Sequence, residues 1–261
     1  MATDKNTVVV ALGQIRPGSG VWAASRLNSF GAPEMSHVTT ACAPPDIPTP
    51  QFGVVTYFLR NALNGPSLPE NAWPPASLFL RRWESAISEY RAGRDELLRY
   101  VTGLPRTNNQ ISVFLRAVGH FEHSVIDAYL AMMAFTALER KVGDAGWKPF
   151  VAGDSSPADR LNRLYNVIKH FDGRFEMGQA LGFPSAYPAP LWITDHGLKG
   201  HTTLLDGKEL KGDWRTRKRL GDARHVEVEV TFDEFAALLN ELTENARMLT
   251  EEPTAPTSPA S

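Results

Sequence analysis

Three polar side chains, spaced three and four residues apart, are the residues of this chain best suited to chemistry. Arg163, Asn166 and His170 fall within roughly 60° of one another on a helical wheel, on the arc opposite the apolar positions. Arg163 and His170 are close to two helical turns apart, or about 10 Å along the axis. A guanidinium binds an anion through a planar fork of donors, and an imidazole exchanges a proton near neutral pH. We therefore predict that this polar stripe, with Lys169 beside it, can converge on one bound group.

The helix that carries the polar stripe has a clear start signal. Ser156 provides a hydroxyl at the N-cap, Pro157 stands at the first helical position, and Asp159 follows three residues after the cap. We expect the helix to end near residue 171, because Gly173 follows. The apolar residues that must face the core are Leu161, Leu164, Tyr165, Ile168 and Phe171. The polar stripe consequently faces either bulk water or a second surface, such as a dimer partner.

The segment from Arg163 to His170 reads Arg-Leu-Tyr-Asn-Val-Ile-Lys-His and resembles the Arg-x(4–6)-His signature of the HEPN superfamily of helical-bundle domains. It is most similar to the members that read Asn-x-x-Lys-His at the end of this helix. Glu122, in the long preceding helix, resembles the acidic residue that this helix often supplies near the motif. The order of helices resembles the superfamily over residues 76–250, whereas the motif itself covers only residues 163–170.

The resemblance implies a metal-independent endoribonuclease, or an RNA-binding protein, of the type found in bacterial toxin–antitoxin and defence systems. It implies a homodimer whose active site forms between the two copies, and it requires no cofactor. His170 would accept the proton of the RNA 2′-hydroxyl and later protonate the leaving 5′-oxygen, while Arg163 would stabilise the transition-state charge on the phosphate. Asn166 would orient the phosphate or the imidazole, and Glu122 completes the implied catalytic set.

Leu164 departs from the pattern of the catalytic members, which commonly carry a polar residue directly after the arginine. Many members of the superfamily are also non-catalytic. A second hypothesis is therefore a non-catalytic helical protein that oligomerises or binds another protein, such as an antitoxin. Under this hypothesis, loss of the His170 side chain changes at most self-association.

A basic segment with an embedded tryptophan suggests a contact with RNA. Lysine and arginine residues gather between residues 208 and 219, around Trp214. A basic loop with an aromatic side chain can follow a phosphate backbone and stack a base. The residues predicted to contact RNA are Lys169, Trp214, Arg215, Arg217 and Lys218.

A metal site is a third and weaker hypothesis. His120, His123 and Asp127 share one face of a helix, and imidazole with carboxylate suits zinc or iron. The Glu-x-x-His pattern of di-iron bundles is absent, because Val125 stands three residues after Glu122, and no His-Glu-x-x-His occurs. We therefore predict no metal ligands.

The composition is that of a globular protein able to bury a sizeable core, with 43% hydrophobic and 21% charged residues. The net charge of −2 gives no overall attraction to nucleic acid or to an anionic membrane, so such a partner needs a local basic patch. Cys42 is the only cysteine; it excludes an intramolecular disulfide, fits a reducing compartment and is expected to be incidental within a flexible segment. No run of about 18 apolar residues occurs, so we expect a cytoplasmic protein without a membrane partner.

The periodicity predicts a mainly α fold: an up-and-down bundle of four to five helices with a small β-containing insertion before the last helix. Residues 1–50 lack periodicity and end in a proline-rich run, so we expect a disordered extension there, followed by the HEPN-like domain over 51–250 and a disordered tail over 251–261. Helices are expected over 51–64, 76–102, 108–142 and 157–171, and a last one follows the capping box Thr231–Glu234. Two of these helices carry an apolar stripe at helical spacing that is expected to face the core. In the helix over 76–102 it consists of Phe79, Trp83, Ile87, Tyr90, Leu97 and Val101, and in the helix over 108–142 of Ile111, Leu115, Val118, Val125, Tyr129 and Met133. Short strands are expected at 191–194, 203–205 and 226–230, within an irregular insertion over 175–230.

Overall fold

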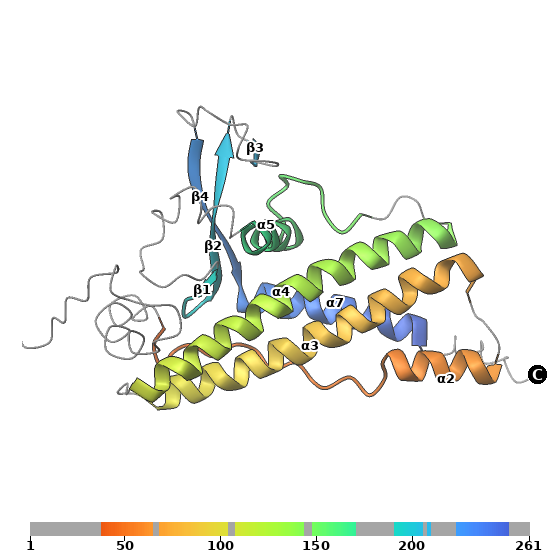
Figure 1. Ribbon diagram of the computed structural model, residues 1–261, viewed down its shortest axis with the longest axis horizontal. Coiled ribbons are helices and arrows are strands. Elements are labelled where there is room, and N and C mark those ends of the chain that lie inside the picture. The colour runs from red at the N-terminus through yellow and green to blue at the C-terminus, as the bar shows by residue number, and fades with distance from the viewer. Residues whose placement is uncertain are drawn as a thin grey trace, which may run out of the picture.

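Two long antiparallel helices, α3 (Trp73–Thr102) and α4 (Asn108–Val142), pack along one another and form the centre of the protein (Figure 1). The computed structural model describes residues 38–64, 68–103, 108–143, 148–170, 191–205, 208–209 and 223–250. Helix α4 has the bounds expected from the sequence. Helix α3 starts three residues earlier than expected, because the prolines at 74 and 75 stand in its first turn, where the missing N–H has no partner to lose.

Apolar side chains at helical spacing build the core between α3, α4 and α7 (Phe232–Thr250). Trp83, Tyr90, Phe121 and Phe235 are fully buried. The Tyr90 ring of α3 meets Phe121 of α4 and Phe235 of α7 edge to face, and Trp83 Nε1 of α3 donates to Thr243 Oγ1 of α7 at 2.9 Å. The stripe predicted on α3 is buried throughout, namely Phe79, Trp83, Ile87, Tyr90, Leu97 and Val101. On α4 the prediction was wrong for Met133, which lies at the surface.

A small antiparallel sheet precedes α7 in the chain, as expected. Its central strand is β2 (Gly197–Leu205), which pairs along its whole length with β4 (Ala223–Thr231). The short strands β1 (Leu191–Ile193) and β3 (Lys208–Glu209) share the other edge of β2. Strand β2 is longer than the three residues expected, because its glycines at 197 and 200 lower the strand signal of the sequence but serve close packing in the fold.

Helix α5 (Pro157–Lys169) lies between this sheet and α4, and α2 (Val54–Asn64) packs against α3 and α7 away from the sheet (Figure 1). A short 3-10 helix, η3 (Glu70–Ala72), leads into α3. The described part of the chain is therefore a mainly helical bundle with a small sheet before its last helix. In that part, none of the helices combines the length and the apolar character that a bilayer crossing requires.

The segment 38–50 corrects two expectations drawn from its proline content. Val38, Cys42 and Ile47 are buried in the core, so Cys42 is not an incidental residue of a flexible segment. The prolines exclude a helix but not packing, since side chains of α3 supply hydrogen bonds to the backbone carbonyls: Tyr90 Oη donates to Pro45 at 3.0 Å, and Arg94 Nε donates to Pro44 at 3.1 Å.

The same segment is tied to the sheet. The Thr39 backbone N–H and hydroxyl donate to the two carboxylate oxygens of Asp195, at 2.5 and 2.7 Å, in the turn between β1 and β2. Segment 38–50 thus joins α3 to the sheet, and the folded domain starts earlier than residue 51. The expectations for residues 1–37 and 251–261 lie outside the described residues.

Candidate functional site on α5

Helix α5 begins as its sequence signal predicts. The backbone N–H of Asp159 donates to Ser156 Oγ at 3.2 Å, and Pro157 occupies the first turn. The helix ends at Lys169, and His170 is its C-cap residue, whose N–H donates to the Asn166 carbonyl at 3.1 Å. The expected helix end at Phe171 and the stop at Gly173 lie outside the described residues.

The apolar side of α5 is fixed on the sheet and on α4. Leu161, Leu164 and Val167 are fully buried. A Cβ placed on Gly200 of β2 would lie 3.0 Å from Leu164 and 3.2 Å from Val167, so α5 sits directly on the backbone of this strand. Leu164 is therefore a packing residue, which accounts for an apolar side chain directly after Arg163.

An aromatic pair joins α5 to α4. The rings of Tyr165 and Tyr129 stack with centroids 4.0 Å apart and an interplanar angle of 17°. Lys169 Nζ lies 5.8 Å from the centroid of the Tyr165 ring, at the end of the same helix. This pair orients the C-terminal part of α5, and with it the exposed residues Lys169 and His170.

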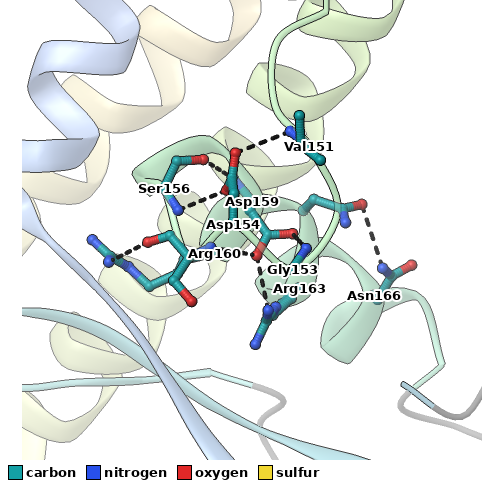
Figure 2. A network of polar contacts seen from close by, with 10 residues as sticks. Val151, Gly153, Asp154, Ser156, Asp159, Arg160, Arg163 and Asn166 are labelled. Carbon is teal, nitrogen blue, oxygen red and sulfur yellow. Dashed lines mark hydrogen bonds and ion pairs between the residues drawn. The ribbon is translucent and has the colours of Figure 1, made fainter. Parts of the chain in front are cut away.

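Arg163 is held by an acidic residue one turn before it. Its guanidinium lies 2.9 Å from the carboxylate of Asp159, which is buried, and the Arg163 side chain keeps 21% of its surface exposed. The Asp159 carboxylate also accepts the backbone N–H groups of Gly153 and Ser155, at 3.1 and 3.3 Å (Figure 2). Ser155 has a φ of +60°, a conformation that side-chain-bearing residues rarely adopt, so these hydrogen bonds stabilise an unusual loop.

The N-terminal part of the polar stripe is therefore only partly open to water, because Asp159 binds both Arg163 and the preceding loop of the same chain. Figure 2 shows this loop, from Val151 to Ser156, lying over the first turn of α5 and the Arg163–Asp159 pair. The C-terminal part remains open: Asn166 is half-buried beside Asn162, 3.4 Å away, and His170 is exposed. The fold thus separates an anchored Arg163 from an accessible His170.

Glu122 of α4 contacts β1, a strand of the sheet on which α5 packs. It is largely buried on α4, and its carboxylate accepts the backbone N–H of Leu191 at the start of β1. The Leu191 side chain packs over Gly200 together with Val167, one turn before His170. Burial raises the pKa of Glu122 to about 7, although the Leu191 N–H lowers it somewhat. Glu122 thus titrates in the range useful for proton transfer.

The raised pKa of Glu122 makes a prediction about stability. Between pH 4.5, its ordinary pKa, and about pH 7, the folded state binds the proton more tightly than the unfolded chain, so the free energy of unfolding falls as the pH rises. Glu122→Gln is expected to be more stable than the wild type above pH 8 by up to about 3 kcal/mol, and equally stable below about pH 4. Urea unfolding at several pH values measures this difference.

Glu96→Gln is the control, because the pKa of Glu96 is lowered in the folded state whereas that of Glu122 is raised. Burial acts to raise its pKa, but the ion pairs with Arg116 and Arg99 outweigh burial and lower it. Glu96→Gln is therefore expected to lose stability at neutral pH rather than gain it. Parallel pH profiles for wild type and Glu122→Gln would contradict the assignment of a near-neutral pKa to Glu122.

Two of the three candidate metal ligands on α4, His120 and Asp127, bind other side chains. His120 Nδ1 lies 2.7 Å from Glu89 Oε2 on α3, whereas His123 is exposed. Asp127 accepts Arg82 Nη1 and Ser85 Oγ, each at 2.6 Å. In the part of the chain that the structure describes, no group of three histidine, cysteine, aspartate or glutamate side chains is placed to hold a metal ion.

Two contacts of this region are not predicted by the sequence pattern. Arg160 pairs with Glu234, the last residue of the capping box that starts α7, and so ties α5 to the last helix. Asp159 was recognised as a cap residue, but not as the anchor of Arg163 and of the loop before α5. The Gly153-Asp154-Ser155 sequence directly before the cap is the local pattern that indicates a tight loop there.

The predicted RNA contacts Trp214, Arg215, Arg217 and Lys218 lie outside the described residues.

Comparison with known proteins gives no family for this chain. No protein-family model matches it, and no curated protein sequence and no solved structure is significantly similar to it.

Proposed function

We propose that this protein is a HEPN-like, metal-independent endoribonuclease whose site lies at the C-terminal end of α5. The observation that carries the proposal is that Glu122 and α5 are joined to the same part of the sheet. Glu122 accepts the Leu191 N–H, and the side chains of Leu191 and Val167 both lie against Gly200, one turn of α5 before the exposed His170. A largely buried carboxyl with a pKa near 7 and an exposed imidazole are the two kinds of group that exchange protons at neutral pH. Perturbed pKa values of this kind gather at functional sites.

RNA supplies its own nucleophile, the 2′-hydroxyl, so the chain needs to supply only proton transfer and charge stabilisation. His170 accepts the 2′-hydroxyl proton, and the phosphate bond to the 5′-oxygen breaks as a 2′,3′-cyclic phosphate forms. The imidazolium, or that of a second copy, protonates the leaving 5′-oxygen. Lys169 is exposed beside His170 and can bind a neighbouring phosphate. Arg163, held by Asp159, is preorganised to offer its remaining donors to the same RNA.

A second candidate function is a non-catalytic interaction protein built on the same fold. The observation that favours it is the commitment of Arg163 to Asp159, because the carboxylate neutralises the charge that would otherwise stabilise a phosphate. Leu164, buried on Gly200, supports it as well, since its role is to pack α5 onto the sheet. Under this function, the α5 end binds a partner but cleaves nothing.

Replacement of His170 separates the two functions. His170→Ala is expected to abolish cleavage of a mixed RNA substrate and to relieve any growth toxicity, while the helical circular-dichroism signal stays unchanged. His196→Ala is the matched control, because His196 is also exposed but lies in the turn between β1 and β2. Gel analysis of the RNA products, with and without a chelator, is the measurement. Wild-type protein that cleaves no RNA between about pH 5 and pH 8 would contradict the ribonuclease and leave the interaction protein.

A further inference from the structure

The face of α2 that points away from the bundle is apolar. Val55, Phe58, Leu59 and Leu63 expose 64%, 47%, 59% and 83% of their surface, and Ala62 is exposed among them. Positions separated by three, four, seven and eight residues share one side of a helix, so these five residues form a continuous α2 apolar stripe. Exposed hydrophobic residues are ordinary when they stand singly, but a continuous stripe of this kind marks an interaction surface.

The opposite face of α2 already has its partners. Tyr57 and Asn61 are buried, and Asn61 Nδ2 donates to the Tyr57 carbonyl at 2.9 Å. Tyr57 lies on the side of α2 that contacts α3 and α7. A wheel centred on Tyr57 puts Val55 and Leu59 about 160° away on either side. Helix α2 therefore packs on the bundle through the face that carries Asn61 and Tyr57. Among the described residues, none packs over its more apolar face.

We infer that the α2 apolar stripe binds the same stripe of a second copy of this chain, with the two helices antiparallel around a two-fold axis at Leu59. A two-fold contact pairs each surface with itself, so the stripe has to be self-complementary. Around Leu59, the antiparallel register sets Val55 against Leu63 of the second copy. In this register the large Phe58 lies beside the small Ala62 of the second copy, offset from it by two residues or about 3 Å along the axis.

The size of the stripe fits a reversible dimer. The four large side chains together expose on the order of 400 Å² of apolar surface, near the level at which a patch usually marks an interaction site. Two copies would bury about 800 Å² through these residues, and the flanking Thr56 and Arg60 bring the contact toward the lower limit of stable interfaces, about 1,200 Å². The stripe carries no charge, so it has no electrostatic feature that would select an unlike partner.

This contact is separate from the proposed ribonuclease site. In Figure 1, α2 and α5 lie on opposite sides of the α3–α4 pair. Self-association through α2 therefore leaves His170 accessible in both copies, and its success or failure does not depend on RNA cleavage. The resulting dimer would carry the C-terminal end of α5 of each copy on its outer surface.

Sedimentation of the full chain over a range of concentrations tests the inference. The wild type is expected to form a dimer that dissociates on dilution, and Leu59→Glu is expected to weaken it at least about 100-fold, because two carboxylates would meet at the two-fold axis. Val151→Glu is the matched control and should dimerise like the wild type, since Val151 is 63% exposed but lies in the loop before α5. A wild type that stays monomeric, or a dimer that persists in Leu59→Glu, would overturn the inference.

Crosslinking tests the register without relying on a disruptive variant. Cys42 is buried and is the only cysteine of the chain, so one introduced thiol reports a single position. Leu59→Cys should form a disulfide-linked dimer on mild oxidation. Val55→Cys should form one only when mixed with Leu63→Cys, because two copies of position 55 lie about 12 Å apart along the axis. Homodimer crosslinks through Val55→Cys would show parallel helices. A monomer in which Leu59→Cys resists a thiol reagent would show that another part of the chain covers the stripe. Either result would overturn the inference.

Discussion

Asp159→Ala is expected to destabilise the protein by about 3 kcal/mol, the lower end of the cost of breaking a buried ion pair. The carboxylate accepts two backbone N–H groups and pairs with Arg163, so its removal leaves Gly153 and Ser155 without their acceptor. Arg163 reaches water through its exposed part, which limits the electrostatic cost. The loop with its left-handed Ser155 should loosen, and Arg163 should lose its fixed position. Chemical denaturation measures the free energy of unfolding.

A surface ion pair provides the comparison for Asp159. Glu244 pairs with Arg247 one turn away on the exposed side of α7, at 2.9 Å. Glu244→Ala should change the free energy of unfolding by less than about 0.5 kcal/mol, because water screens both groups. Equal losses in the two variants would mean that burial of Asp159 contributes nothing, contrary to the network drawn in Figure 2.

Gly197→Ala is expected to cost about 3 kcal/mol or to prevent the β1–β2 turn from forming. A Cβ at this position would lie 2.2 Å from the Val230 carbonyl oxygen and 2.6 Å from the Thr231 Cα. Both atoms belong to the backbone of β4, at the point where the chain enters α7, so the clash cannot be relieved by a side-chain rotation. The Gly197 carbonyl also accepts the Thr194 N–H at 2.9 Å and thereby closes the turn.

Gly119→Ala is the control for Gly197→Ala, with the opposite expected sign. Gly119 lies inside α4, and a Cβ there would meet no atom within 4 Å. Alanine should stabilise the helix by about 1 kcal/mol, because it restricts the unfolded chain and has the higher helix propensity. Thermal melts of both variants check the pair. A stable Gly197→Ala would contradict the close approach of β2 and β4.

The two proposals make one combined expectation for this protein. If both hold, Leu59→Glu yields a monomer that still cleaves RNA, and His170→Ala yields a dimer that does not. Each variant then reports on one surface alone. If cleavage requires both copies at one site, Leu59→Glu retains cleavage only when the copies associate through a surface other than α2.

Local signals in the sequence were enough to predict helices α3, α4, α5 and α7 and the starts of α4, α5 and α7. The bounds of α4 and the capping residues Ser156 and Thr231 follow from periodicity and hydrogen-bonding side chains within a few residues of one another. These interactions are short-range, so the fold does not alter them. The buried stripe of α3 follows for the same reason, since one face of a long amphipathic helix has to be covered.

Tertiary contacts decided what the polar stripe on α5 does. The helical wheel placed Arg163, Asn166 and His170 together, and the sequence left their environment open between water and a second surface. Only the fold joins the loop before α5 and Arg163 through Asp159, leaves His170 exposed, and links Glu122 to the sheet through the Leu191 N–H. These contacts join residues on different elements, whose relative placement depends on packing rather than on spacing in the chain. The sequence thus determines which residues make up the polar stripe. The tertiary structure decides that Arg163 is held by Asp159 and that His170 is exposed.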